Sequence, residues 1–376
     1  MEKKTIMILG GYGNTGLSIA RLLLTYSSTD IVIAGRNLNK AEATAAELNT
    51  EYDCKRINAC RVDASSPESL VDGLIGIDLL VVASSTAQYA DLVARAAIDC
   101  GSDYFDVQYS TGKLEALRSL QKQIEERGLC FITDGGFHPG LPAALVRYGA
   151  ASFDRLNKAV VGSVIQINWS SLEFSSSTID ELVSEFANFK NLVFKDGKWQ
   201  PGGVLSWIIP RWFVFPHGFG RRYCVPMYLE EMRPLPERYP DLAETGFYVG
   251  GFNWFTDWFI TPLTMFLPRI FKASGMRLSG LIMEWSLKKF SRPPYGTLLK
   301  LEAEGLRNSQ EKALEVSVFH QDGYALTAIP ATACILQYLD GTIRSPGLFY
   351  QALAVEPARF INDMQRMGAE ITRREK

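Results

Sequence analysis

Seven residues near the N-terminus have the types and spacing needed to bind a diphosphate. They are Gly10, Gly11, Tyr12, Gly13, Asn14, Thr15 and Gly16, and they fit both the GxGxxG and the GxxGxxG patterns. Glycines permit a tight turn and let backbone N–H groups approach a pyrophosphate at the N-terminus of the following helix. The segment follows an expected strand at residues 5–9 and precedes an expected helix at 15–25, the context that supports dinucleotide binding. An ordinary glycine-rich turn is the alternative interpretation.

The end of the second expected strand indicates which dinucleotide binds. It reads Ala34-Gly35-Arg36-Asn37, without the Asp or Glu that usually accepts hydrogen bonds from the ribose 2′-hydroxyl of NAD. Arg36 can bind a 2′-phosphate through two hydrogen bonds, and Lys40 lies one helical turn further on. We therefore predict NADP(H), bound by Arg36, Asn37 and Lys40, with a solvated arginine at a helix start as the alternative. Asp63, after the third strand, is placed to accept a hydrogen bond from the adenine amine. The alternative is that it is only an acidic residue at a helix N-terminus.

Polar residues follow the later expected strands, at the sheet edge where ligands of parallel α/β sheets bind. His138 lies in the turn 134–142, and its unperturbed pKa suits it to donate a proton to a reduced substrate. A histidine that only hydrogen-bonds the turn is the competing interpretation. Tyr109 is the second catalytic candidate, and Gln108 and Phe137 are expected to contact the substrate. Three further residues at this edge are assigned to the cofactor, namely Ser84, Ser85 and Thr86.

Tyr109 and Lys113 also have the Tyr-x-x-x-Lys spacing of short-chain dehydrogenases, in which the lysine lowers the pKa of a tyrosine that donates a proton to a carbonyl. One such match is expected by chance in a chain with 15 tyrosines. In that family both residues lie on one helix, whereas here Gly112 interrupts them and Tyr109 follows the strand too closely. This chemistry is therefore the second hypothesis.

Six short apolar runs alternate with helical stretches between residues 5 and 133. This alternation predicts an α/β domain with a doubly wound parallel sheet, the Rossmann fold. Helix boundaries carry their own signals, such as Ser65-Ser66-Pro67 at a start and Gly101 and Gly128 after ends. The expected strands are Thr5–Leu9, Ile31–Ala34, Ile57–Val62, Leu79–Ala83, Tyr104–Val107 and Leu129–Thr133.

After about residue 150 the pattern changes to longer strands, aromatic-rich loops and Asp-Gly turns. Lys195–Lys198 and Gln321–Tyr324 are each expected to form a hairpin, because Asp-Gly tolerates positive φ angles. We expect an inserted α+β domain with a mixed sheet for substrate binding and homodimer formation. Helices in Pro330–Leu339 and in the tail to Ile371 are expected to return to the first domain. The predicted domains are residues 1–145 (Rossmann), 146–328 (α+β) and 329–376 (C-terminal helices).

The composition argues against several classes of protein. With 39 basic and 41 acidic residues the net charge is −2, so no global positive field attracts nucleic acid. Six cysteines without CxxC pairing and three histidines favour neither a metal site nor a disulfide framework. The apolar run at residues 6–9 is too short for an export signal. We expect a cytoplasmic protein that binds a small-molecule substrate and neither metal nor nucleic acid.

Two aromatic runs occupy residues 207–215 and 254–271 of the second domain. Prolines and charges interrupt them, so neither supplies the about twenty continuous apolar residues of a membrane span. Core packing is the default, and an apolar pocket, a dimer surface and peripheral membrane contact are the alternatives. A basic fringe suited to anionic headgroups accompanies them, formed by Arg211, Arg221, Arg222, Arg269 and Lys272.

The chain resembles the saccharopine dehydrogenase-like reductases, a family that includes saccharopine reductase, carboxynorspermidine dehydrogenase and a lipid-acting enoyl reductase branch. The resemblance covers about the first 145 residues, through Gly10–Gly16, Ala34–Asn37 with Lys40, Gly101–Val107 and Gly136–Leu141. It implies a Rossmann domain completed by the C-terminus, an inserted substrate domain and hydride transfer from NADPH between them. Amino-acid-linking members commonly carry Asp before the Pro-Gly pair, where this chain has His138, which argues against an amino-acid substrate.

The sequence thus predicts an NADPH-dependent oxidoreductase that transfers hydride to a C=N or C=C bond of an unidentified, apolar or lipid-like substrate. Carbonyl reduction of the short-chain-dehydrogenase type, through Tyr109 and Lys113, is the second hypothesis. A non-catalytic NADP-binding sensor or scaffold is the third, because a Rossmann fold does not by itself prove catalysis. The third hypothesis predicts that no carbonyl, imine or enoyl compound oxidises the bound NADPH.

Overall fold

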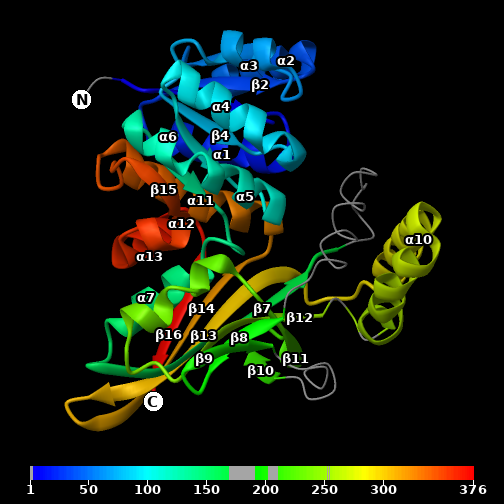
Figure 1. The fold of residues 1–376 in the computed structure, drawn as a ribbon, viewed down its shortest axis with the longest axis vertical. Coiled ribbons are helices and arrows are strands. Elements are labelled where there is room, and N and C mark those ends of the chain that lie inside the picture. Colours follow the sequence, from blue (N-terminus) through cyan, green and yellow to red (C-terminus); the bar gives the residue numbers. More distant parts are fainter. Residues whose placement is uncertain (1–2, 169–190, 202–210, 252, 254) are drawn as a thin grey trace. The chain divides into compact units, whose positions relative to one another are not determined.

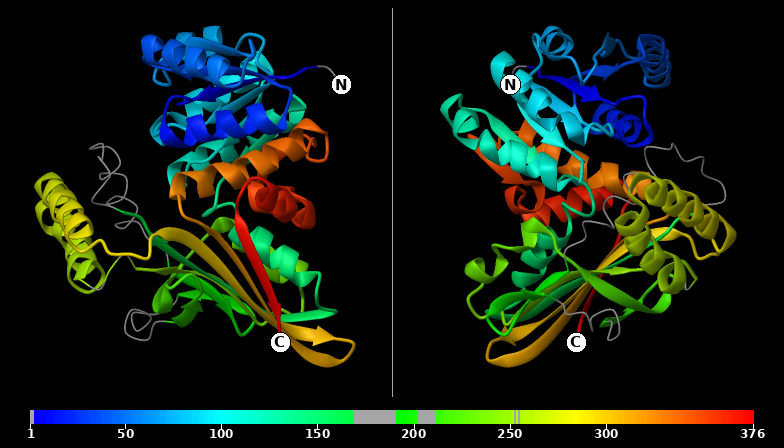
Figure 2. Two further views of the ribbon diagram at one scale, coloured as in Figure 1. Left: turned by 180° about the vertical axis from the view of Figure 1, so that it is seen from behind. Right: turned by 45° about the vertical axis from the view of Figure 1, so that its right-hand side comes forward.

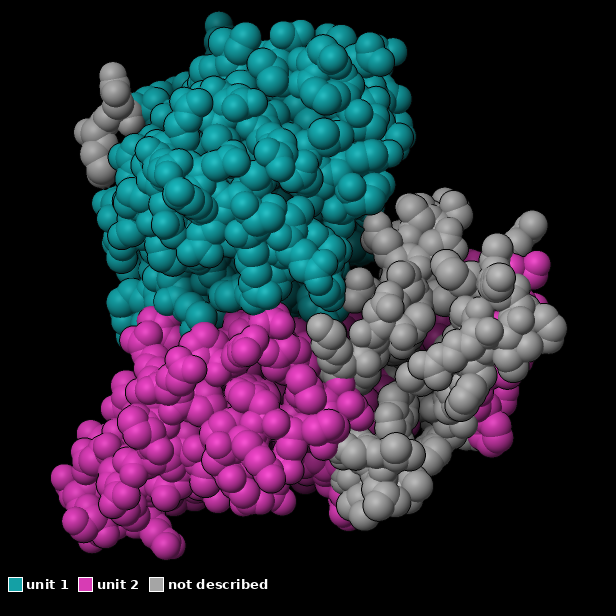
Figure 3. All heavy atoms as spheres, viewed as in Figure 1, with its two compact units in different colours: residues 1–144, 324–368 teal, residues 145–323, 369–376 magenta. Residues whose placement is uncertain are grey.

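The chain folds into two compact units, distinguished by colour in Figure 3. The first comprises Met1–Ala144 and Tyr324–Gly368, and the second comprises Leu145–Gly323 and Ala369–Lys376. The structure is a computed structural model that describes residues 3–168, 191–201, 211–251, 253 and 255–376. Only the backbone is described for residues 257 and 258 and for part of the helix at 261–289.

The first unit is built on a parallel seven-stranded sheet with helices on both faces (Figure 1). Its strand order is β15-β6-β5-β4-β1-β2-β3. Every residue of β4, β5 and β6 is buried, as expected for a parallel sheet covered on both sides. The strands are β1 (Thr5–Leu9), β2 (Asp30–Gly35), β3 (Ile57–Arg61), β4 (Leu79–Val82), β5 (Asp103–Asp106), β6 (Cys130–Thr133) and β15 (Gly347–Tyr350). The predicted Rossmann fold and its six strands are therefore confirmed, and β15 is a seventh strand that was not predicted.

The helices of this unit begin and end at the predicted signals. Ser66 caps α3 by accepting a hydrogen bond from the backbone N–H of Ser69, and Gly101 ends α4 with a φ of 71°. Apolar residues of α3 to α6 pack with β1, β2, β4, β5 and β6 in one buried cluster. The helices are α1 (Asn14–Tyr26), α2 (Leu38–Glu51), α3 (Pro67–Leu74), α4 (Ala90–Cys100), α5 (Thr111–Ser119), α6 (Gln121–Glu126), α11 (Gly323–Leu339), α12 (Gln351–Ala354) and α13 (Pro357–Arg366).

The second unit contains a mixed nine-stranded sheet, as predicted. Its main path runs β10-β11-β12-β7-β13-β14-β16, with β12 and β7 parallel and the other pairs antiparallel. The strands are β7 (Arg155–Gln166), β8 (Leu192–Lys195), β9 (Lys198–Pro201), β10 (Arg211–Phe215), β11 (Gly220–Met227), β12 (Glu244–Gly250), β13 (Gly296–Arg307), β14 (Gln310–His320) and β16 (Glu370–Glu375). The helices that accompany it are α7 (Pro142–Ala150), α9 (Leu235–Arg238), η5 (Thr256–Ile260) and α10 (Thr261–Lys289).

One predicted hairpin is confirmed and the other is wrong. β8 and β9 pair antiparallel around Asp196 and Gly197, whose φ angles are 52° and 78°. Gln321–Tyr324 is instead the connection from β14 into α11, whose apolar residues are buried. The long hairpin of this sheet, β13–β14, turns at Asn308 and Ser309, which have positive φ angles of 52° and 62°. Without an Asn-Gly or Asp-Gly pair, this turn has no strong sequence signal.

The C-terminal tail departs from the expectation of helices alone. After α11, the chain adds β15 to the parallel sheet and then forms α12 and α13. Glu370–Glu375 is not helical but forms β16, which pairs with β14 in the second unit and is drawn in red in Figure 2. Its residues are all exposed or half-buried, which fits an edge strand.

The aromatic runs are only partly core. Phe213 and Phe215 of β10 are buried, and Phe213 lies against Gly162 of β7, because the sheet curls β10 back over its centre. Trp212 and Val214 on the opposite face of β10 are exposed. Trp207–Pro210 and Trp254 lie outside the described residues. Within the described part of the chain, no helix is long and apolar enough to cross a membrane, and no group of three or more His, Cys, Asp or Glu side chains is placed to hold a metal ion.

Candidate functional site

The glycine loop connects β1 to α1 in a form that exposes backbone N–H groups. Gly10 has a φ of +88°, and its N–H donates to the Ala34 carbonyl at 2.8 Å. A Cβ on Gly16 would overlap the Gly10 carbonyl, so any larger residue would push α1 away from the loop. α1 has Gly13 as its N-cap, with no side-chain capping hydrogen bond and no acidic residue in the first turn. Its first N–H groups are therefore available to an anion.

Tyr12 joins this loop to the start of α2. Its hydroxyl lies 2.5 Å from where a Cβ of Gly35 would stand, so a larger residue at the end of β2 would push the Tyr12 ring aside. The backbone N–H of Asn37 donates to the Tyr12 hydroxyl at 3.3 Å. The Asn37 side chain caps α2 by accepting from the Lys40 N–H at 3.1 Å. Tyr12 and Asn37, both predicted to bind cofactor, thus also hold the loop and α2 together.

Arg36 and Lys40 are exposed beside this junction, and neither side chain has a hydrogen bond or ion pair with any described residue. Asp63 accepts from the backbone N–H of Ser65 at 3.0 Å and from its hydroxyl at 2.7 Å. These hydrogen bonds lower the pKa of Asp63, and the charge of Arg36 contributes to the shift. Asp63 therefore shapes the β3–α3 turn, while Arg36 and Lys40 remain available to a phosphate.

The loops after β4 and β5 are joined by Gln108. Its side-chain amide donates to the Ser84 carbonyl at 2.5 Å and to the Thr86 hydroxyl at 3.2 Å. The hydroxyls of Ser84 and Thr86 are 2.9 Å apart, and Ser85 between them is exposed. Gln108, predicted to contact the substrate, therefore fixes the predicted cofactor loop.

Lys113 forms a buried ion cluster below these loops. Its ammonium group donates to Asp106 at 2.8 Å, to Asp134 at 2.7 Å and to the Gln108 carbonyl at 2.5 Å, and its side chain is 0% exposed. Thr133 donates its hydroxyl to the second oxygen of Asp106 at 2.7 Å. Burial alone would lower the pKa of Lys113, but the two carboxylates outweigh it and raise that pKa. All three ammonium hydrogens are used, so the cluster ties the ends of β5 and β6 to α5.

The turn that carries His138 is held by Gln351, a residue that sequence reasoning did not identify. Gln351 begins α12, and its side chain is fully buried. Its amide donates to the carbonyls of Gly136 at 3.0 Å and Gly140 at 3.1 Å, and its oxygen accepts from the Gly136 N–H at 3.2 Å. The only sequence signal is positional, because Gln351 directly follows an apolar run at 347–350, as the other site loops follow their strands.

His138 lies half-buried in this turn, with its ring 4.0 Å from that of Phe137 between centroids. Burial lowers the pKa of His138 to about 3. The expectation of an unperturbed pKa is therefore wrong, and the imidazole is neutral near pH 7. A neutral imidazole can donate a hydrogen bond but carries no proton in excess. Tyr109, the other catalytic candidate, is 37% exposed.

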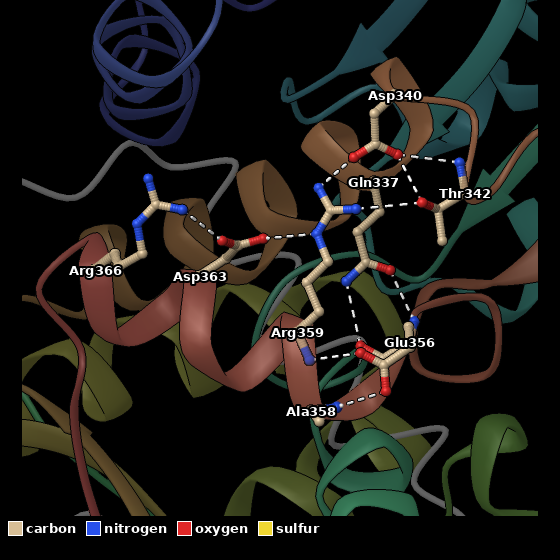
Figure 4. Close-up of polar contacts among 8 residues, drawn as sticks. All are labelled: Gln337, Asp340, Thr342, Glu356, Ala358, Arg359, Asp363 and Arg366. Atoms are coloured by element: carbon tan, nitrogen blue, oxygen red, sulfur yellow. Dashed lines mark hydrogen bonds and ion pairs between the residues drawn. The ribbon is translucent and has the colours of Figure 1, made fainter.

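A polar network fixes the C-terminal segment that supplies Gln351 (Figure 4). Gln337 of α11 exchanges hydrogen bonds with the backbone of Glu356, and the Glu356 side chain caps α13. Arg359 of α13 pairs with Asp340 at the end of α11 and donates to Asp363 at 3.3 Å. The network thus links α13 to the end of α11. These two helices precede and follow β15 and α12 in the chain. Its remaining members in Figure 4 are Thr342, Ala358 and Arg366.

Comparison with known proteins identifies the domain that carries this loop. Residues 6–132 match the family model of the saccharopine dehydrogenase NADP-binding domain. The N-terminal part of the chain is therefore similar to this family. A solved structure of saccharopine dehydrogenase (L-Glu forming) from Saccharomyces cerevisiae aligns with 99% of this chain and 100% of its own, with a TM-score of 0.70 and 13% identity. At this identity the likeness shows a shared fold across both units of the chain.

Two further solved structures are more distant. A myo-inositol dehydrogenase from Corynebacterium glutamicum aligns over 97% of this chain and 95% of its own, with a TM-score of 0.47 and 12% identity. A short-chain dehydrogenase/reductase from Veillonella parvula in complex with NADP aligns over 35% of this chain and 68% of its own, with a TM-score of 0.27 and 16% identity. We draw no functional argument from either.

Proposed function

We propose that this protein is an NADPH-dependent oxidoreductase that reduces a C=N or C=C bond in an apolar or mixed substrate. The observation that carries the proposal is the exposed guanidinium of Arg36, which bonds no described residue. Arg36 directly follows β2, the strand that pairs with β1 before the glycine loop. Neither Asp nor Glu directly follows β2, so no carboxylate there competes with a phosphate for Arg36. A cation in this position suits the 2′-phosphate that distinguishes NADP from NAD.

The residues around the loop fit the cofactor. The uncapped N-terminus of α1 would hold the pyrophosphate, and Arg36 with Lys40 would hold the 2′-phosphate. The Ser84–Thr86 loop, fixed by Gln108, would lie along the ribose side of the site. NADPH, when bound, supplies the hydride. The protein's contribution is to orient the cofactor and substrate and to place hydrogen-bond donors beside the acceptor bond.

The charges at the sheet edge support a substrate that is not an amino acid. Within the described loops 84–86, 106–110 and 134–141, the two carboxylates belong to Asp106 and Asp134, and both are paired with Lys113. His138 is neutral near pH 7. These loops therefore offer no unpaired charge to an ammonium or a carboxylate group, which is what an amino-acid substrate would need. The matching turn of amino-acid-linking relatives commonly has Asp where this chain has His138.

Two side chains are candidates to assist proton transfer. His138 is a neutral imidazole that can donate a hydrogen bond to the atom that receives negative charge during reduction, and Gln351 holds its turn in place. Tyr109 is the other candidate. The short-chain-dehydrogenase mechanism would need Lys113 to lower the pKa of Tyr109. Lys113 instead uses all three of its hydrogens on Asp106, Asp134 and the Gln108 carbonyl, which argues against that mechanism.

A substrate panel tests the proposal. The purified full-length protein is mixed with NADPH, and oxidation is followed by cofactor absorbance with unsaturated lipids, polyamine imines, and pairs of an amino acid with a keto acid. We expect oxidation with an unsaturated or imine compound of apolar character. Oxidation with amino-acid pairs alone would contradict the substrate class. Tight NADPH binding without oxidation by any compound would favour the sensor or scaffold hypothesis.

A further inference from the structure

The long helix α10 exposes a stripe of apolar side chains. Leu278, Leu281 and Trp285 follow the three-and-four spacing of one helical face, and they are 46%, 59% and 52% exposed. α10 does not run straight, because Ser286 near its end lies beside Thr256, which precedes its start, so Leu263 belongs to the other arm of the helix. From Leu278 to Trp285 the stripe is about 11 Å long at 1.5 Å per residue.

The opposite face of α10 already has its packing partners. Met283 and Leu287 are buried with Ile260 of η5, and Ser286 accepts a hydrogen bond from the Thr256 hydroxyl at 3.0 Å. Trp285 is oriented at the border of the two faces by edge-on contacts with Phe255 and Phe290, each at 6.0 Å between ring centroids. The exposed stripe is thus a second apolar face, which packing within the described part of the second unit does not use. Neighbouring apolar side chains exposed together on one face are typical of interaction sites.

The charge of α10 indicates what covers this face. The helix contains five basic residues and one acidic residue, Glu284, although the chain as a whole has a net charge of −2. Lys289 at its end is exposed, and Lys288 pairs with Glu284 at 2.7 Å. Two copies of such a helix would repel each other, whereas an anionic surface would attract it. The remaining basic residues of α10 are Arg269, Lys272 and Arg277, whose side chains are not described.

The structure also redefines the basic fringe proposed from the sequence. Arg211 pairs with Glu244, and Arg222 bonds Gln166 at 2.9 Å, so both serve contacts within the sheet. Arg221 lies over the exposed ring of Trp212, 4.5 Å from its centroid. Of the described members of this fringe, Arg221 is therefore the cation that makes no such contact within the sheet.

We propose that the exposed face of α10, formed by Leu278, Leu281 and Trp285, lies on the surface of an anionic lipid bilayer. A helix with an apolar stripe, a tryptophan and an excess of lysine and arginine has the chemistry of an interfacial helix, with its axis in the plane of the membrane. The apolar stripe enters the boundary of headgroups and acyl chains, and the basic residues attract acidic headgroups. This inference is independent of the proposed reaction.

Vesicle flotation of the full-length protein tests this inference. We expect the protein to float with phosphatidylcholine vesicles that contain phosphatidylserine, and to float less at high salt or with phosphatidylcholine alone. Leu281→Glu should weaken partitioning about tenfold or more, because it places a charge in the apolar boundary. Ile75→Glu is the matched control, since Ile75 is 73% exposed in the first unit and receives the same charge. An unchanged thermal denaturation midpoint in both variants confirms that they fold.

Three results would overturn the inference. A protein that stays soluble at low salt with anionic vesicles does not bind them. Equal flotation of the Leu281→Glu and Ile75→Glu variants would place the contact elsewhere on the chain. A native protein that does not float, but loses a self-associated form in sedimentation when Leu281 is changed to Glu, would show that a second copy covers α10.

Discussion

Gln351 and Gly136, 215 positions apart in the chain, exchange two hydrogen bonds through one buried side-chain amide. The same amide also reaches Gly140, so Gln351 spans the turn that carries His138. Gly136 and Gly140 have φ angles of +108° and +115°, a region that favours glycine. The shape of this turn therefore depends on a residue from the C-terminal return of the chain.

Gln351→Ala should loosen the turn. Loss of the amide leaves buried backbone groups of Gly136 and Gly140 without their partner, which costs about 1 to 3 kcal/mol for each unsatisfied group. We expect a lower denaturation midpoint and reduced NADPH oxidation, while NADPH affinity changes little. Gln337→Ala is the matched control, because Gln337 is also fully buried and also bonds backbone groups, those of Glu356. Equal loss of turnover in both variants would show that Gln351 contributes stability only.

His138 should make the stability of the protein depend on pH. Its pKa in the folded chain is about 3, below the ordinary value of 6.5, so the unfolded chain binds the proton first as the pH falls. The contribution of the neutral His138 to the free energy of unfolding is fully present above about pH 6.5. As the pH falls from 6.5 towards 3, the free energy of unfolding decreases by up to about 1.4 kcal/mol per pH unit. Urea denaturation at about pH 7.5 and about pH 5.5 should show roughly 1 kcal/mol more loss for the native protein than for His138→Gln. Equal losses would contradict the lowered pKa.

The two candidate catalytic side chains should differ in their effect on turnover. His138→Ala should lower the rate of NADPH oxidation about a hundredfold or more while NADPH still binds, the usual cost of removing a hydrogen bond to developing charge. Tyr109→Phe should cost less. With a neutral His138, the rate should show no histidine ionisation near pH 6.5. If Tyr109→Phe abolishes turnover and His138→Ala is nearly silent, the short-chain-dehydrogenase mechanism holds instead.

Lys113→Met should destabilise the first unit strongly. It leaves the Asp106 and Asp134 carboxylates buried without their cation, and breaking a buried ion pair from one side costs about 3 to 5 kcal/mol. Replacing Asp134 by Asn in the same chain should restore part of the loss. Lys122→Met, at an exposed helical pair with Glu126, should change the free energy of unfolding by about 0.5 kcal/mol or less. A Lys113→Met protein of native stability with no activity would indicate a catalytic lysine.

The sequence was most informative where a local pattern has one physical meaning. The runs Thr5–Leu9 and Leu79–Val82 are continuous and apolar because both faces of the parallel sheet are covered. Gly16 is required by its close contact with the Gly10 carbonyl, a neighbour only six positions away in the chain. Strands β1 to β6 of the first unit and the glycine loop of the predicted cofactor site could therefore be predicted from local sequence.

Features that depend on partners distant in sequence were not predictable. β15 is a run of four residues whose pairing with β6 crosses more than two hundred positions, and Gln351 takes its role from that pairing. The lowered pKa of His138 arises from burial that the turn sequence does not reveal. Asp322-Gly323 has the composition of a hairpin, but the buried apolar residues of α11 that follow make it a helix start.

The central claim, NADPH binding through Arg36, is tested most directly by comparing the affinities of NADPH and NADH in the native protein and in Arg36→Ala. Arg36 bonds no described residue, so its removal should leave the fold intact. Loss of a charge-assisted contact to the 2′-phosphate should weaken NADPH about ten- to a hundredfold, or roughly 1.5 to 3 kcal/mol, and leave NADH nearly unchanged. Arg36→Lys keeps the charge without the bidentate geometry, so its NADPH affinity should lie between those of the native protein and Arg36→Ala. Equal weakening of both cofactors, or tighter binding of NADH by the native protein, would contradict the account.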